Sequence, residues 1–147
     1  IDTWCELEDE YFKYELEEII KRYAKSIMNY QQENGSWNWI VTLKESRADS
    51  SATATLAWFL SKASEINILN EECLQASYKA LQYLMSVTRR NGSVDFSQGD
   101  TKGIGVYSQL FDVMPFAQGF CIRSVNHLLN LQMKEFKREN RISEGVI

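Results

Sequence analysis

The sequence predicts an all-α fold made of helical hairpins, of the kind that builds an α/α toroid. Two observations carry this prediction. Amphipathic and largely apolar helical segments alternate along the chain, and the residues Asn-Gly-Ser-Trp at 34–37 recur 57 residues later as Asn-Gly-Ser-Val at 91–94. A hairpin with one apolar helix cannot bury that helix alone, so repeated hairpins build a shared core by stacking. About two and a half hairpins are expected here, too few to close a ring.

Composition and charge narrow the class of protein. The chain has 147 residues, 44% of them hydrophobic, which excludes disorder and fits a single domain over residues 1–147. A net charge of −4 without a basic stripe excludes nucleic acid as the expected partner. No apolar run approaches the roughly 20 residues of a membrane span, so no membrane partner is expected. Cys5, Cys73 and Cys121 are odd in number and far apart, and no signal-peptide core is present; we therefore expect three buried thiols and a cytoplasmic location.

The first amphipathic helix is predicted over residues 10–32. Its glutamates crowd the start and its lysines and arginine follow, an order that suits the helix dipole, and Asn34-Gly35 ends it. Apolar residues at steps of three and four define one stripe, leaving one wet face. That stripe consists of Phe12, Leu16, Ile19, Ile20, Tyr23, Ile27 and Tyr30.

The second helix is predicted to be an inner one. Asp49, Ser50 and Ser51 form an N-cap cluster, and residues 52–60 are small or apolar on every side, which marks a helix surrounded by other helices.

The third helix is predicted to be amphipathic again, capped by Asn70 and ending near residues 91–92. Its apolar stripe is Leu74, Tyr78, Leu81, Leu84 and Met85. A fourth, largely apolar helix is predicted to begin near Pro115, a residue suited to the first helical position, and a charged tail over residues 134–139 continues it into solvent. The predicted order is therefore outer, inner, outer, inner.

The lengths of the connections indicate where a site would lie. The turn over residues 65–70 is short, whereas residues 33–48 and 90–114 form long, aromatic-rich loops. Loops longer than about 12–15 residues in a compact domain are usually functional or disordered. In antiparallel hairpins both long loops reach the same end, beside the N-termini of the inner helices, where backbone N–H groups favour an anionic or hydroxyl-rich ligand.

Several loop residues are candidates for such a site, each with a structural alternative. Trp37 and Trp39 are suited to stacking on sugar rings, or one of them plugs the end of the ring of helices. Asp49 is either a helix cap or a carboxylate that faces the cavity. Asp100 and Lys102 either contact a ligand or pair with each other at the surface.

The remaining polar residues give weaker signals. Three glycines within residues 99–105 permit close approach of the backbone to a ligand, but no strand is predicted before them, so they form no dinucleotide fingerprint. His127, the only histidine, is expected to be structural or at the surface. Gln118 and Arg123 lie where either could reach the cavity, and a buried Arg123 would need a carboxylate partner. No catalytic triad, thiolate site or metal cluster can be assembled, so no metal is expected.

Four blocks of the sequence resemble the unsaturated uronyl hydrolases, the unsaturated glucuronyl and rhamnogalacturonyl hydrolases of glycoside hydrolase families 88 and 105. The resembling blocks are residues 34–37, 47–54, 99–107 and 114–119. The resemblance extends from about Tyr11 to Leu131; the glycine-rich block is its most specific part, and the Asn-Gly-Ser-Trp block alone is weak.

The resemblance implies a six-hairpin α/α barrel of which this chain is the C-terminal portion. It also implies oligosaccharide substrates ending in a 4,5-unsaturated uronic acid, as released by polysaccharide lyases, and hydrolysis by hydration of the vinyl ether without metal or cofactor. The principal catalytic Asp of the family lies in the N-terminal half and has no counterpart here. The isolated chain is therefore expected to be inactive and to supply part of the cavity wall. The expected wall residues are Trp37, Asp49, Ser50, Asp100, Lys102 and Tyr107.

Two other classes of protein stay open at this point. Gln31, Gly35 and Trp37 also fit the repeat motif of terpene cyclases, but those enzymes use Asp-rich clusters and none occurs in this sequence. The non-enzymatic alternative is a carbohydrate-binding or structural helical-repeat protein, which would need its exposed inner helices covered, most simply by self-association.

Overall fold

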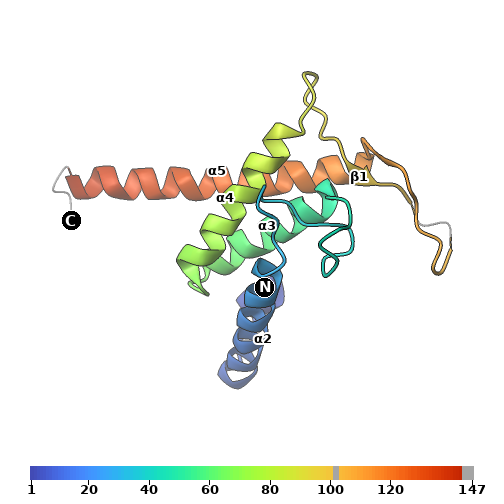
Figure 1. Ribbon diagram of the computed structural model, residues 1–147. Coiled ribbons are helices and arrows are strands. Elements are labelled where there is room, and N and C mark those ends of the chain that lie inside the picture. Colours follow the sequence, from blue (N-terminus) through green and yellow to red (C-terminus); the bar gives the residue numbers. More distant parts are fainter. Residues whose placement is uncertain (101–102, 144–147) are drawn as a thin grey trace.

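The computed structural model describes residues 1–100 and 103–143, and within them the fold is mostly helical (Figure 1). In chain order the elements are α1 (Asp2–Glu6), α2 (Glu10–Met28), α3 (Ser50–Glu65), α4 (Asn70–Ser86), β1 (Ser97–Gln98), β2 (Phe111–Asp112) and α5 (Pro115–Ser143). The four long helices are those that the periodicity predicts. The short helix α1 and the antiparallel ribbon formed by β1 and β2 are additions that the sequence analysis did not anticipate.

Helix α3 is the centre of the fold, because it packs against both α4 and α5. Its buried residues lie on several sides of the helix, which confirms that it is an inner helix of the kind found in α/α toroids. These buried residues are Ser50, Thr53, Ala54, Ala57, Leu60, Ser61, Ala63 and Ser64. Helix α2, in contrast, extends away from the other long helices in Figure 1 and buries only Ile20 and Ala24.

The repeated Asn-Gly-Ser segments form the same turn twice. In each, the asparagine Oδ1 accepts hydrogen bonds from both the backbone N–H and the hydroxyl of the serine two residues later. Each central glycine has positive φ, +90° at Gly35 and +86° at Gly92, a conformation that L side chains rarely adopt. The internal repeat read from the sequence is therefore a structural repeat.

Helix α2 departs from its predicted stripe. It ends at Met28 rather than near residue 32, and its buried residues are Ile20 and Ala24. Ile27 and Met28 are partly buried and also pack against the core. Ile19 and Tyr23, which the stripe assigned to the buried face, are 41% and 56% exposed. The predicted stripe therefore includes more residues than are buried. Periodicity marks every apolar position on a helix face but does not show which of them a neighbouring helix covers.

Helix α4 also differs from its prediction at both ends. Its N-cap is Leu69, in a left-handed conformation with φ of +46°, while Asn70 Oδ1 accepts a hydrogen bond from Ser64 Oγ at 2.6 Å. The helix ends at Ser86, before the second Asn-Gly-Ser turn, and Met85 is exposed. The buried face consists mainly of small residues, which let α4 approach α3 closely. Its members are Cys73, Ala76, Ser77, Ala80, Tyr83 and Leu84.

Helix α5 begins at Pro115, as predicted, and continues through the charged segment as one 29-residue helix. Arg123, which could have reached the cavity, does not line it and is exposed, with its guanidinium carbon 4.0 Å from the centre of the Trp58 ring. His127 lies beside Glu65, with Nε2 3.7 Å from the carboxylate, which agrees with a structural role. No helix in the described part of the chain is long and apolar enough to span a membrane.

The three cysteines are free thiols, but only two are buried, so the expectation for Cys5 is wrong. Burial raises the pKa of the Cys73 thiol and of the Cys121 thiol to about 11. Because the thiolate is the reactive form, we expect only Cys5 to react with a disulfide reagent in the native protein at mildly alkaline pH. All three should react after unfolding in urea. Counting the modified thiols by mass spectrometry checks this, and rapid native labelling of Cys73 would contradict the packing of α3 against α4.

Candidate functional site

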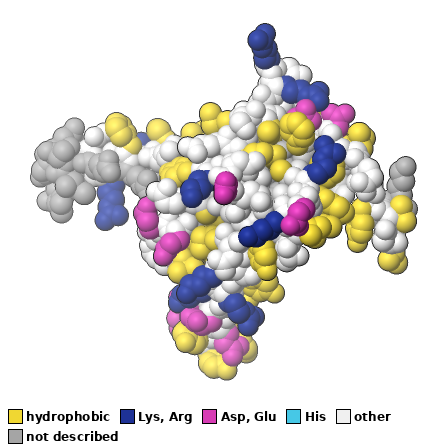
Figure 2. Space-filling view, in the orientation of Figure 1, with side chains coloured by type: hydrophobic (Ala, Val, Ile, Leu, Met, Phe, Trp, Pro, Cys, Tyr) yellow, Lys and Arg dark blue, Asp and Glu magenta, His cyan; other side chains and the backbone are white. Residues whose placement is uncertain are grey.

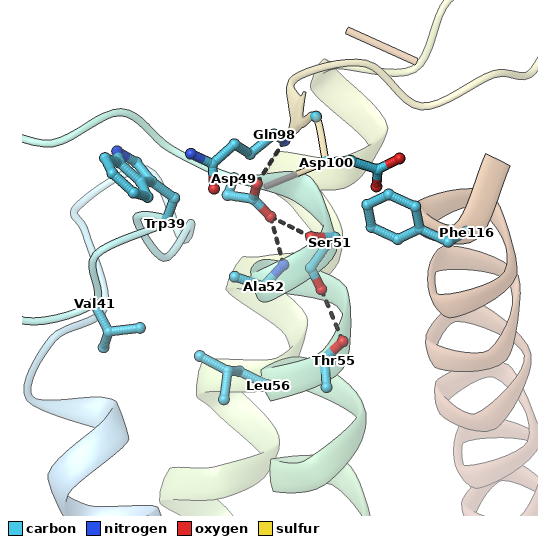
Figure 3. Close-up of a pocket in the computed structure, with 11 residues that line it drawn as sticks. Trp39, Val41, Asp49, Ser51, Ala52, Thr55, Leu56, Gln98, Asp100 and Phe116 are labelled. Atoms are coloured by element: carbon cyan, nitrogen blue, oxygen red, sulfur yellow. Dashed lines mark hydrogen bonds between the residues drawn. The ribbon is translucent and has the colours of Figure 1, made fainter. Parts of the chain in front are cut away.

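A cavity of about 480 Å³ opens where the two long loops meet the N-termini of α3 and α5 (Figure 3). The first loop contributes Trp39 and Val41, and the second contributes Gln98, Gly99 and Asp100. The rest of the wall comes from Asp49, Ser51, Ala52, Thr55 and Leu56 at the start of α3 and from Phe116 in the first turn of α5. Loops from two successive hairpins thus lie side by side at the end of the fold where the inner helices begin.

Asp49 is both a helix cap and a residue of the cavity wall. Its Oδ1 accepts hydrogen bonds from Ala52 N, at 2.7 Å, and from the Ser51 hydroxyl, so it caps α3. Its Oδ2 accepts a hydrogen bond from Gln98 N at 2.7 Å, which attaches the second loop to the start of α3. Figure 3 shows these bonds converging on one carboxylate. The two alternatives left open for Asp49 are therefore compatible, and the carboxylate also fixes the shape of the cavity.

The aromatic part of the wall is Trp39 supported by Tyr107. Their ring centres are 5.4 Å apart with the planes tilted by 58°, so a side chain from the second loop packs against one from the first. Tyr107 is exposed, and Trp39 is half-buried with its indole lining the cavity. In the view of Figure 3, Trp39 and Phe116 lie on opposite sides of Asp49. An apolar ring beside carboxylates is an arrangement suited to a ligand with both a flat apolar face and hydroxyl groups.

Trp37 does not belong to this wall, although the sequence analysis assigned it there. It is completely buried, and its indole N–H donates to the Ile27 carbonyl oxygen at 2.9 Å. Its backbone N–H donates to Thr53 Oγ1 at 2.9 Å. Trp37 is thus a core residue that joins the first loop to α2 and α3, and it has no free face for a sugar.

Ser50 is also structural rather than exposed to the cavity. It is completely buried, its hydroxyl donates to the Asp95 carbonyl oxygen, and its backbone N–H donates to the Phe96 carbonyl oxygen at 3.0 Å. Gln118 was one of two residues that could have reached the cavity, but its side-chain amide instead pairs with both the N–H and the carbonyl of Val94, at 2.8 Å each. Both residues hold the second loop in place without lining the site.

The two charged residues predicted in the glycine-rich block have different outcomes. Asp100 is exposed and lines the cavity, whereas Lys102 lies outside the described residues. Gln98 and Phe116 also line the cavity but were not predicted as site residues. Their positions, next to the glycine-rich block and directly after Pro115, are the sequence signals that indicate them. Among the residues that the structure describes, no group of three or more His, Cys, Asp or Glu side chains is placed to hold a metal ion.

Comparison with known proteins identifies the family of this chain. Residues 6–131 match the model of Glycosyl Hydrolase Family 88. A search of curated proteins found no match. Two similar solved structures are described as possible members of the GH105 family. The one from Klebsiella pneumoniae has a TM-score of 0.77 and 18% identity, and the match covers 86% of this chain and 34% of that one.

The second structure, from Salmonella enterica serovar Paratyphi A, has a TM-score of 0.71 and 20% identity, over 85% of this chain and 34% of the other. At these identities the likeness shows the fold alone, that of the α/α toroid, and this chain spans about a third of each neighbour. The family itself rests on the family-model match, which includes the α3 cap, both long loops and the first turns of α5. The chain belongs to glycosyl hydrolase family 88.

Proposed function

We propose that this chain forms part of the substrate-binding wall of a hydrolase that acts on oligosaccharides ending in a 4,5-unsaturated uronic acid. The observation that carries the proposal is the cavity itself, which Trp39 lines together with the exposed carboxyl group of Asp100 and the capping carboxyl group of Asp49. Of the two carboxyl groups, that of Asp100 is the one available to a ligand. An indole suits stacking on a sugar ring, and carboxylate oxygens accept hydrogen bonds from hydroxyl groups. The volume falls in the range of about 300–1,000 Å³ that is usual for small-ligand sites.

The proposed reaction is hydration of the vinyl ether of the unsaturated sugar. A carboxylic acid protonates C4 of the double bond, water adds at C5, and the resulting hemiketal opens and releases the glycosidic bond. This differs from hydrolysis by two flanking carboxyl groups. We assign the acid to a residue outside this chain. Asp49 is not assigned this role, because its carboxylate already accepts three hydrogen bonds from protein groups. These bonds link the start of α3 to the second loop.

The proposed partner is therefore an oligosaccharide. We also propose a reducing, cytoplasmic compartment, because all three cysteines are free thiols. The competing terpene-cyclase interpretation loses support from the family match and from the missing Asp-rich cluster. In the non-catalytic alternative, a carbohydrate-binding or structural protein, the same cavity is present but the bound sugar is not hydrolysed.

A binding and turnover assay on the isolated chain tests the proposal. We expect an unsaturated uronyl disaccharide to bind without loss of the ultraviolet absorbance of its double bond. Asp100→Ala should weaken binding about ten- to a hundredfold, because a charged hydrogen bond is worth about 1.5–3 kcal/mol. The melting temperature should stay unchanged because Asp100 is exposed. Glu71→Ala, an exposed carboxylate on α4, is the matched control. Equal binding of a saturated disaccharide would contradict the proposed specificity, and turnover by the chain alone would contradict the assignment of the acid.

A further inference from the structure

The hydroxyl groups of the cavity wall already donate their hydrogen atoms to the protein. The Ser51 hydroxyl donates to Asp49 Oδ1, and the Thr55 hydroxyl donates to the Ser51 carbonyl oxygen at 2.8 Å. Both side chains line the cavity at the start of α3. A hydroxyl group has one hydrogen atom and two lone pairs, so in this arrangement each of the two offers a ligand an acceptor oxygen rather than a donor.

The second loop adds further acceptor oxygens to the same wall. Gln98 Nε2 donates to the Ser108 carbonyl oxygen at 2.9 Å, which identifies Oε1 as the acceptor end of this amide. The backbone N–H of Gln98 is also used, because it donates to Asp49 Oδ2 at 2.7 Å. Figure 3 shows the Gln98 side chain extending from the second loop towards Trp39. Asp100 follows two residues later and contributes an exposed carboxylate to the wall.

The start of α3 does not require an anion from the ligand. The N-terminus of a helix is positively polarised and commonly binds an anionic group. Here that group is the Asp49 carboxylate, whose Oδ1 accepts a hydrogen bond from Ala52 N at 2.7 Å in the first turn. A second negative charge on a ligand would be repelled by this carboxylate and by that of Asp100. Of the anionic and hydroxyl-rich ligands that the sequence left open, the capping carboxylate favours the hydroxyl-rich one.

This concentration of acceptor oxygens is a property of the cavity wall. Over the face of the molecule in Figure 2, by contrast, acidic and basic side chains are interspersed. A sugar hydroxyl can donate to the oxygens of the wall and still accept from a donor such as the Trp39 indole N–H, whereas a carboxylate or sulfate group can only accept. The wall is therefore complementary to an uncharged sugar ring that carries hydroxyl groups.

We propose that this wall binds the uncharged second ring of an unsaturated uronyl disaccharide, and that the carboxylate of the first, unsaturated ring points away from it. Of the two rings, only the second can be free of acid groups. Gln98 and Asp100 are the specificity-determining residues, because their oxygens face the ligand side of the second loop, and Asp49 is a positioning residue that holds this loop on α3. The inference rests on the proposed function and adds which end of the substrate lies here.

Moving the negative charge along the substrate tests this proposal. Titration calorimetry on the full chain compares a parent unsaturated disaccharide, with a neutral N-acetylhexosamine as its second ring, with two derivatives. In one the uronate is a methyl ester, and in the other the second ring carries a sulfate group. We expect the ester to bind like the parent, because its carboxylate lies away from the wall. Sulfate on the second ring should weaken binding about tenfold at low salt, and less at high salt, because the repulsion between like charges is screened.

Variants of Asp100 attribute the effect of sulfate to this wall. Asp100→Asn keeps the size of the side chain and removes its charge, so the ratio between the affinities for the parent and for the sulfated form should fall. Asp100→Lys should reverse the order of the two ligands. Asp100 is exposed, so both variants are expected to fold. Glu71→Gln, at an exposed carboxylate in the first turn of α4, is the matched control and should keep the wild-type ratio.

Two results would overturn the inference and leave the proposed function intact. Tighter binding of the ester than of the acid, with the gain lost in Asp100→Asn, would place the unsaturated ring against this wall. Equal binding of the parent and the sulfated form would place the second ring away from Asp100. If none of the disaccharides binds, the proposed function itself is wrong, and this inference fails with it.

Discussion

Replacement of Gly35 by alanine is expected to lower the free energy of unfolding by at least about 4 kcal/mol, a loss reached only by exceptional substitutions. Two physical costs combine. The φ of +90° adds strain of roughly 1–2 kcal/mol for an L residue. The new methyl group would also lie 2.2 Å from the carbonyl oxygen of Lys79, a backbone atom that can move only if α4 separates from the turn. Because domains of this size have about 5–15 kcal/mol of stability in total, the variant should be largely unfolded under mild denaturing conditions.

Gly92→Ala is the matched control for this prediction. The residue occupies the same turn with φ of +86°, but its added Cβ would meet no atom of the described chain. Only the conformational strain remains, and we expect a loss of roughly 1–2 kcal/mol. Urea unfolding followed by circular dichroism, at a concentration where the chain is monomeric, measures both variants. Similar losses at the two glycines would show that α4 does not press on the first turn.

Local chemistry was enough to predict the helices and their order. The 3.6-residue periodicity located the four long helices, Pro115 marked the start of α5, and the Asn-Gly-Ser repeat revealed the hairpin unit. These signals act within one or two turns of helix or depend on a rule of chain topology. They also brought the two long loops to the same end of the fold, where the cavity lies.

The choice of buried face could not be predicted in the same way, because it depends on which neighbours are present. Ile19 and Tyr23 fit an apolar stripe as well as Ile20 does, yet only Ile20 meets the core. On α4, Ala76 and Ala80 are buried, although the predicted apolar stripe named larger residues in their place. Small residues are needed where helices approach most closely, but a prediction based on hydrophobicity alone gives them little weight.

The candidate site shows the same limit at single residues. Asp49 was located correctly because its two roles, capping α3 and bordering the cavity, both follow from its place before the helix. Ser50, the next residue, is completely buried beneath the second loop. Adjacent positions at a helix start point in different directions, and the path of a long loop decides which of them reaches the cavity.

Variants of Trp37 and Trp39 should distinguish an effect on stability from an effect on binding, because both residues were predicted from the sequence to stack on sugar rings. Trp37→Ala is expected to cost about 3–5 kcal/mol, the usual range for removal of a buried large aromatic side chain. The variant would leave a cavity between the first loop, α2 and α3, and would leave the Ile27 carbonyl oxygen without its indole donor. Trp37→Phe keeps a ring but loses the N–H, and should cost less than the alanine variant.

Trp39→Ala is expected to behave in the opposite way. Its indole lines the cavity and contacts the exposed ring of Tyr107, so its removal should change the free energy of unfolding by less than about 1 kcal/mol. Binding of an unsaturated uronyl disaccharide should weaken about tenfold, because a stacked ring contributes up to about 1.5 kcal/mol. Urea unfolding and titration calorimetry on the same two variants check both halves of the prediction. A Trp39→Ala chain that binds like the wild type would remove Trp39 from the site and leave polar lining residues such as Gln98 and Asp100 to account for binding. A stable Trp37→Ala chain would contradict the burial on which the reassignment of Trp37 rests.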